Sequence, residues 1–215
     1  MTRKSVGQRA RPRKQPLQSR AQKTVEVIVE ATARILETRG HDGFTTNAVA
    51  ERAGVSIGTL YQYFPNKDAL LGALIARETT LLVDDAELAV AAPSGPAALD
   101  VLIGAAVAHQ IRRPALARLL DFEESRMPLD ADRLRVRGRF QAILASVLSR
   151  PDLPPQPDPH TLVVDVAAII QGMLDAAGER GETAREALMT RVRRAVVGYL
   201  QTSPRPFGEK NAKRR

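Results

Sequence analysis

The 215-residue sequence contains no cysteine and no tryptophan, and aromatic residues make up only 4% of it. The absence of cysteine excludes disulfide bonds, thiolate metal sites and a cysteine nucleophile, and it is consistent with a reducing cytoplasm. Strands are usually rich in β-branched and aromatic residues, whereas alanine, leucine and arginine dominate this chain. The composition therefore favours an all-α fold.

Long apolar runs are also missing. No run approaches the roughly 18 residues that a membrane-spanning helix needs, and the basic N-terminus lacks the apolar stretch of a signal peptide. We therefore expect a cytoplasmic protein without a membrane partner.

The segment before Glu26 contains no acidic residue but eight lysine and arginine residues. The rest of the chain has equal numbers of basic and acidic residues, so the net charge of +8 comes from this segment. Because the segment has few apolar residues, we predict a disordered basic arm over residues 1–18. Such an arm can follow phosphates or enter a minor groove, or it can be a solubilising tail. Residues 203–215 are expected to form a flexible basic tail.

Hydrophobic periodicity and capping residues predict nine helices. The first covers about residues 19–39, and Gly40 ends it. Thr45 is placed to cap a short second helix, with Phe44 and Val49 in the positions of a hydrophobic staple.

Ser56 is placed to cap a third short helix, which Pro65 ends because the residue before a proline resists the α conformation. Asn66 caps a fourth helix that should run to about Ala92. The later helices are a fifth that ends at the "RRP" of residues 112–114, a sixth through Phe122, a seventh over about 129–149, an eighth over about 160–178 and a ninth over about 183–202. Between the seventh and eighth, "PDLPPQPDPH" has five prolines in ten residues and predicts a stiff exposed connector.

The second and third helices have the form of a helix-turn-helix unit, because Gly54 permits a sharp turn between them. The third helix would span about 12 Å, which is comparable with the width of a DNA major groove. Leu60 and Phe64 lie four residues apart and can face the supporting helices. Gly58 removes a side chain where a backbone must approach another surface, at a helix cost of about 1 kcal/mol. The residues left facing outward are Thr59, Gln62 and Tyr63.

The segment "GHDGFTTNAVAERAGVSIGTLYQYFPNKDALL", residues 40–71, is similar to the DNA-binding region of the tetracycline-repressor (TetR) family of transcriptional regulators. The similarity is dense and ungapped, and "AERAGVS", "GTLYQYF" and "NKDALL" carry it. The remainder resembles the family only in being all-helical and of suitable length. The resemblance implies a DNA-binding domain over residues 19–67 and a ligand-binding and dimerisation domain over residues 68–202.

The family resemblance also implies partners. They are double-stranded DNA with a palindromic operator, a second copy of the chain held through the helices at 160–178 and 183–202, and a small-molecule ligand that releases a repressor from DNA.

Carried over position by position, the resemblance implies contacts to the DNA backbone and to base edges. The residues expected at phosphates are Thr46, Ser56, Tyr61 and Lys67, and those expected at or near base edges are Ile57, Gly58, Thr59, Gln62 and Tyr63.

Each DNA-binding residue also has a structural alternative. Thr46 and Ser56 can serve only helix termini, Tyr61 can pack its ring in the core, and Lys67 can be a solvated lysine. Ile57 makes no hydrogen bond and can instead contact a thymine methyl group. His41 stands where the family often carries an aromatic ring, and we expect it to be a partly buried structural histidine.

A ligand pocket is expected among the fourth to eighth helices. The candidate residues are His109, Phe122, Phe140 and Met173, and the alternative for each is an ordinary core residue.

Other function classes have weaker support in the sequence. Its histidines and the acidic "DFEES" segment, residues 121–125, could in principle furnish an acid, a base or a metal site, but no motif organises them. We therefore expect no enzyme, no cofactor and no metal site. A general DNA-coating or architectural protein, driven by the basic arm, remains an alternative, and it predicts weak sequence preference.

Overall fold

The structure is a computed structural model that describes residues 16–126 and 131–202. All regular secondary structure in these residues is helical, as nine α-helices and one short 3-10 helix, which confirms the all-α prediction. The chain divides into two compact units, and the boundary between Leu70 and Leu71 falls inside helix α4. Most of the predicted basic arm and the whole predicted C-terminal tail lie outside the described residues.

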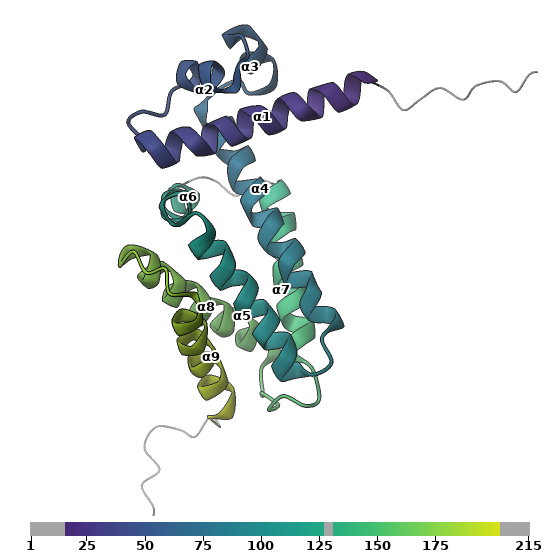
Figure 1. Cartoon of the computed structure of the whole chain (residues 1–215). Coiled ribbons are helices and arrows are strands. Elements are labelled where there is room, and N and C mark those ends of the chain that lie inside the picture. Colours follow the sequence, from purple (N-terminus) through teal and green to yellow (C-terminus); the bar gives the residue numbers. More distant parts are fainter. Residues whose placement is uncertain (1–15, 127–130, 203–215) are drawn as a thin grey trace, which may run out of the picture. The chain divides into compact units, whose positions relative to one another are not determined.

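Unit 1 contains α1 (Pro16–Arg39), α2 (Thr46–Ala53), α3 (Ile57–Tyr63) and the start of α4 (Lys67–Glu87) (Figure 1). Helix α1 packs against α2, and α2 packs against α3. Gly40 has a φ of 63° and Gly54 a φ of 67°, in the left-handed region that glycine adopts without strain. These two glycines therefore end α1 and α2 as the sequence predicts.

Side-chain caps fix where the short helices begin. The side chains of Thr45, Ser56 and Asn66 accept hydrogen bonds from backbone N–H groups three residues later, at 3.1, 3.0 and 2.8 Å. Phe44 and Val49 are fully buried on either side of the first cap, as expected of a hydrophobic staple. All three predicted caps are thus confirmed.

Unit 2 holds the rest of α4, a 3-10 helix η1 (Leu88–Ala91) and five more α-helices. These are α5 (Gly95–Arg112), α6 (Pro114–Arg126), α7 (Ala131–Leu148), α8 (Pro159–Glu179) and α9 (Arg185–Gln201). Helix α5 is the most buried of them and contacts α6, α7, α8 and α9. The expectation that the fourth helix reaches Ala92 was wrong, because α4 ends at Glu87 and tightens into η1.

The connector between α7 and α8 is largely exposed, as the sequence predicts, and it is also fixed at its start. The Arg150 guanidinium donates hydrogen bonds to the backbone carbonyls of Ala89, Val90 and Ala92. Asp152 accepts a hydrogen bond of 2.7 Å from the Gly95 backbone N–H. Leu153 is buried in the core of unit 2. The connector therefore holds the turn between α4 and α5 in place.

Among the described helices, α8 alone is long and apolar enough to cross a membrane by length and composition. This helix was not predicted as a candidate span, because Asp165 and Asp175 interrupt the apolar run while the average hydropathy stays high. One face of α8, which includes Val166 and Ile170, is buried in the core of unit 2. A second face remains exposed, where Val164 is 48% accessible. Packing in unit 2 thus accounts for only part of the apolar character of α8.

Candidate nucleic-acid interface and ligand cavity

Helix α3 divides into a buried face and an exposed face. Leu60 is fully buried and Phe64, at the C-terminal cap, is 6% exposed, as their spacing predicts. On the other face Ile57 is 39% and Tyr63 is 36% exposed, and Gln62 is exposed beside them. Packing against α2 therefore presents Ile57, Gln62 and Tyr63 to solvent, whereas Thr59 is half-buried.

Two of the predicted phosphate-binding residues, Thr46 and Tyr61, lie together. Thr46 is the first residue of α2, and its hydroxyl hydrogen-bonds the Tyr61 hydroxyl across 3.2 Å. Tyr61 is 50% exposed, so its ring does not pack in the core. The two hydroxyls form a polar pair on the solvent side of the junction between α2 and α3.

The start of α3 is built around the Ser56 hydroxyl. This oxygen accepts a hydrogen bond from the Thr59 backbone N–H at 3.0 Å and lies 2.8 Å from the Thr59 hydroxyl. Ser56 therefore serves as the helix cap, and its interaction occupies the Thr59 hydroxyl as well. Ser56 stays exposed, so capping the helix leaves it accessible to a phosphate.

Lys67 lies at the start of α4, with its amine 4.9 Å from the centre of the Phe44 ring. This cation–π contact steadies the amine at the edge of unit 1 without neutralising its charge. His41, which lies on the loop before α2, is exposed. The expectation of a partly buried His41 was wrong.

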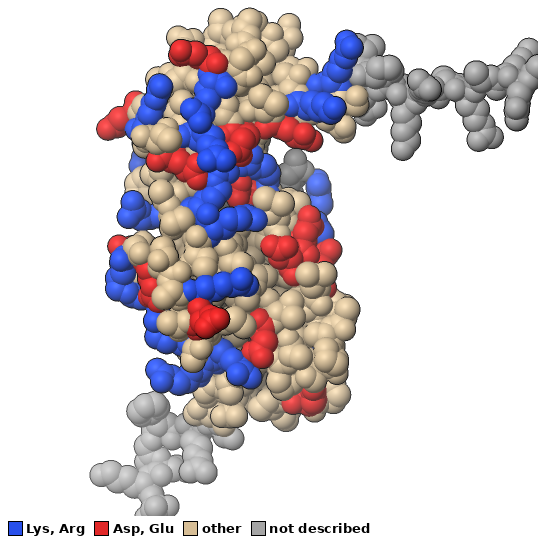
Figure 2. Space-filling model, in the orientation of Figure 1, with Lys and Arg blue, Asp and Glu red and all other residues tan. Residues whose placement is uncertain are grey.

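The exposed face of α3, which we call the reading surface, has no charged side chain. Residues 55–66 contain no lysine, arginine, aspartate or glutamate. In Figure 2 the surface at the place that α3 occupies in Figure 1 is tan, and basic and acidic groups lie beside it and are interspersed over the rest of this face. The residues of α3 therefore carry no charge that could attract a phosphate, and the nearest basic side chain after it in the sequence is Lys67.

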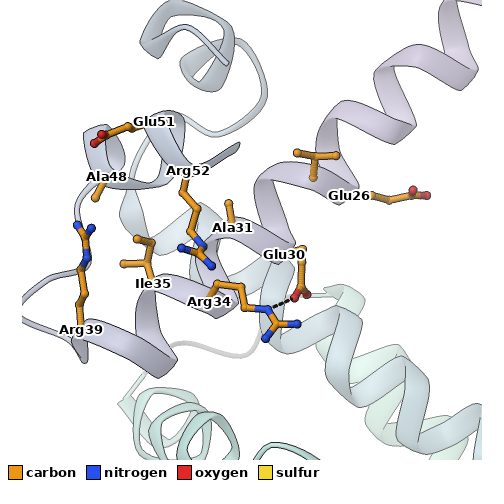
Figure 3. Close-up of a pocket in the computed structure, with 10 residues that line it drawn as sticks. Glu26, Glu30, Ala31, Arg34, Ile35, Arg39, Ala48, Glu51 and Arg52 are labelled. Carbon is orange, nitrogen blue, oxygen red and sulfur yellow. Dashed lines mark hydrogen bonds and ion pairs between the residues drawn. The ribbon is translucent and has the colours of Figure 1, made fainter. Parts of the chain in front are cut away.

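A separate hollow of about 700 Å³ opens to solvent between α1 and α2. Its lining mixes both charges, and Arg34 donates a hydrogen bond of 2.8 Å to Glu30 within it (Figure 3). The predicted DNA-binding residues do not line it. The hollow is therefore distinct from the reading surface on α3.

Unit 2 contains a small cavity of about 40 Å³ between α4, α5 and α6. This volume accommodates a few water molecules. The cavity has a polar side and an apolar side, and its lining residues are Ile75, Glu78, Thr79, His109, Arg113, Leu116, Ala117 and Leu120.

The polar side of the cavity is a charge cluster. The Glu78 carboxylate is buried and lies 2.6 Å from Arg77, 3.3 Å from Arg112 and 4.0 Å from Arg113. These partners satisfy a charge that would be costly to bury alone. Burial lowers the pKa of His109, and Arg112 lowers it further, against weaker opposing effects of Glu78 and Asp85. The His109 imidazole is therefore neutral at pH 7 and able both to donate and to accept a hydrogen bond.

Comparisons with known proteins match both units. Residues 28–74 match the model of bacterial regulatory proteins of the tetR family, and residues 96–200 match the tetracyclin repressor-like C-terminal domain. The chain belongs to the TetR family. As a TetR-family member it is a DNA-binding regulator of a family whose members form dimers.

The curated relatives of this TetR-family chain include repressors that match it strongly over a short stretch. The HTH-type transcriptional repressor KstR of Rhodococcus jostii (strain RHA1) is 47% identical over 51 residues, which is 24% of this chain and 24% of KstR. The match thus spans about a quarter of the curated relative's length.

Two solved structures cover nearly all of the fold. A TetR-family regulator from Streptomyces coelicolor is 26% identical with a TM-score of 0.62, over 82% of this chain and 99% of that one. FadR from Bacillus subtilis is 17% identical with a TM-score of 0.69, over 80% of this chain and 97% of that one. The second likeness establishes the fold alone.

In this TetR-family chain, the four ligand-binding residues expected from sequence do not come together. His109 lines the cavity, whereas Phe140 and Met173 pack half-buried against the core of unit 2. Phe122 is 57% exposed, and the Arg126 guanidinium lies 5.2 Å from its ring centre.

Sequence reasoning missed Glu78 and the apolar residues of α6 that face it. A usable signal existed, because Glu78 lies three and four residues after Ile75 and Leu74 on the apolar stripe of α4. Among the described residues, no group of three or more metal-ligating side chains is gathered.

Proposed function

We propose that this protein is a sequence-specific transcriptional repressor that acts in the cytoplasm, binds a palindromic operator as a homodimer and is released by a small molecule. The observation that carries the proposal is the uncharged, exposed face of α3, held outward by buried Leu60 and Phe64. A general DNA-coating protein needs basic groups but no such surface. The neutral helix therefore favours sequence reading over coating.

The two sets of DNA contacts have different roles. Thr46, Ser56, Tyr61 and Lys67 hold phosphates and position α3, since hydroxyl and amine groups at helix ends typically make such contacts. The side chains of α3 that then reach the base edges are those of Ile57, Thr59, Gln62 and Tyr63. Gly58 lies where the backbone of α3 comes closest to the DNA.

The dimer interface is proposed on the exposed faces of α8 and α9. Val164, Ala168 and Gly172 follow one another at helical spacing on the exposed face of α8. A Cβ atom added at Gly172, or at Gly198 on α9, would meet no atom within 4 Å of the same chain. Small residues without an internal reason to be small permit close approach of a second copy. A two-fold dimer would place its recognition helices on half-sites about 34 to 36 Å apart.

The ligand is proposed to enter unit 2 beside the small cavity. Its polar end would meet neutral His109 and the Glu78 cluster, and its apolar part would lie along Leu116 and Leu120. The TetR fold can accommodate such a molecule, since the Bacillus subtilis neighbour was solved in complex with stearoyl-CoA. The cavity must widen to admit a ligand of that kind, because its present volume is only about 40 Å³.

Helix α4 supplies the proposed coupling between ligand and DNA, because it carries Lys67 at its first residue and Glu78 three turns later. A ligand that prefers the state unsuited to DNA by about 1 to 3 kcal/mol would weaken operator binding about 5- to 150-fold. By reciprocity, operator DNA must weaken ligand binding by the same factor. Calorimetry of one ligand with and without operator measures this directly, and equal affinities would refute ligand control.

The proposed function is tested by selecting sequences from random DNA with the purified protein. We expect the wild-type protein to enrich one palindrome. The same selection with Gln62→Ala should show a relaxed preference at particular base pairs of that palindrome. Lys67→Ala should weaken binding to all sequences alike. Gln141→Ala removes an exposed glutamine of α7 and serves as the matched control. Absence of any enriched sequence would overturn the proposal.

The dimer has its own test. Ala168→Arg places a charge in the proposed interface without changing the core, since Ala168 is exposed. Light scattering at micromolar concentration should show a dimer for the wild type and a monomer for the variant. A wild-type chain that stays monomeric and still binds the palindrome tightly would rule out this assembly.

A further inference from the structure

The beginning of α3 exposes hydrocarbon where a base-reading helix usually exposes hydrogen-bonding groups. Ile57 is the first residue of the helix and is 39% exposed. Gly58 follows it without a side chain. The hydroxyl of Thr59 is engaged by Ser56 at 2.8 Å, which leaves the methyl group as its uncommitted part. The first three residues of α3 thus offer an apolar surface.

Packing within the chain does not explain this surface. A Cβ atom at Gly58 would meet only the Ser56 hydroxyl oxygen, at 3.9 Å, so no neighbour requires glycine there. The 39% of the Ile57 surface that stays exposed gains no burial from its own fold. Since the N-terminal residues of a recognition helix contact base edges, an external apolar group is the natural partner of Ile57.

The chemistry of the major groove narrows that partner to one group. Thymine carries a methyl group at C5, whereas the other bases present donors and acceptors there. Guanine is most often read by arginine or lysine, and residues 55–66 contain neither. We propose that Ile57, assisted by Gly58 and Thr59, selects a thymine at one fixed position of each operator half-site by contact with its methyl group. This inference rests on the proposed function and names one base that the protein recognises in each half-site.

The experiment removes one methyl group at a time. Starting from the selected palindrome, each thymine is replaced symmetrically by deoxyuridine, which keeps every Watson–Crick hydrogen bond. Fluorescence anisotropy titrations then give the affinity of the wild-type dimer for each duplex. We expect one thymine position to be sensitive, with a loss of about fourfold per half-site, which corresponds to about 0.8 kcal/mol for one buried methyl group.

Variants assign the effect to Ile57. Ile57→Ala should bind the thymine and deoxyuridine operators alike, whereas Ile57→Val should keep most of the difference. Val27→Ala truncates another exposed apolar side chain of unit 1, on α1, and should retain the full difference. Because Ile57 is exposed, its replacement does not endanger folding, and an unchanged unfolding curve verifies this.

Two results would overturn the inference alone while leaving the operator intact. One is a selected palindrome in which every deoxyuridine duplex binds as tightly as its thymine parent. The other is an Ile57→Ala protein that keeps the full sensitivity to deoxyuridine. Failure to select any palindrome would instead overturn the proposed function, so the two failures are distinguishable.

Discussion

Gly58→Ala separates the demands of folding from those of DNA binding at a single residue. The Gly58 backbone does not have a positive φ, and an added Cβ atom would make only an ordinary contact at 3.9 Å with Ser56. Alanine is favoured over glycine within a helix by up to about 1 kcal/mol. The variant should therefore raise the free energy of unfolding by up to about 1 kcal/mol per chain, measured by urea denaturation.

DNA binding should change in the opposite direction. If DNA approaches the bare backbone of Gly58, the new methyl group occupies space that the DNA surface needs. Overpacking a fitted interface costs about 1 to 3 kcal/mol, which corresponds to a loss of affinity of about 5- to 150-fold. Anisotropy titration with the selected operator measures this loss.

Gly138→Ala is the matched control for this experiment. Gly138 is an exposed glycine of α7, and a Cβ atom there would meet nothing within 4 Å. It should stabilise the fold to a similar extent and leave operator binding unchanged. A Gly58→Ala protein that binds the operator as tightly as the wild type would refute the close approach of DNA to α3.

Three further predictions follow from particular contacts. Arg150→Ala removes the hydrogen bonds to the carbonyls of Ala89, Val90 and Ala92 and should lower the free energy of unfolding by about 2 to 3 kcal/mol. Arg150→Lys should have an intermediate effect. An unchanged midpoint of urea denaturation in Arg150→Ala would show that these hydrogen bonds do not stabilise the fold. The pKa of His109 lies below the ordinary histidine value of 6.5, so the unfolded state binds the proton more readily, and stability should fall as the pH drops below about 6.5 towards the lowered pKa. In His109→Gln that part of the pH dependence should disappear, and identical profiles for the two proteins would contradict the assignment. Removal of residues 1–15 should flatten the dependence of log affinity on log salt, because each phosphate contact contributes about 0.9 to the slope; an unchanged slope would mean that the arm does not contact DNA.

The helix boundaries of unit 1 could be predicted because local chemistry sets them. Thr45, Ser56 and Asn66 each cap a backbone N–H three residues away, so the whole interaction is contained in a short stretch of sequence. The outward face of α3 followed from the spacing of Leu60 and Phe64 alone. Family resemblance then supplied the expected roles, which composition could not give.

The end of α4 could not be predicted in this way. The apolar residues 88–92 continue the helical pattern. However, the Arg150 guanidinium donates hydrogen bonds to three of their backbone carbonyls from about 60 positions away along the chain. A contact of that range overrides local propensity and leaves no mark in the pattern.

The cavity in unit 2 also depends on contacts between segments that are distant in the sequence, so it could not be predicted either. It forms where α4, α5 and α6 meet, and periodicity gives the faces of single helices but not which faces meet. Aromatic character was a poor guide to the pocket, since Phe122 lies on the surface beside Arg126. A charged residue on an apolar stripe, as at Glu78, would have been the better guide.

Sequence-specific reading by α3 is tested most directly by one titration at constant salt. Wild-type protein is titrated with the selected palindrome and with a scrambled duplex of the same length and base composition. Sequence-specific reading predicts a preference for the palindrome of about 10³-fold or more, as specific DNA-binding proteins typically show. Gln62→Ala should narrow that preference while binding the scrambled duplex as the wild type does. Equal affinity of the wild-type protein for the two duplexes would rule out sequence-specific reading and support a general DNA-coating protein.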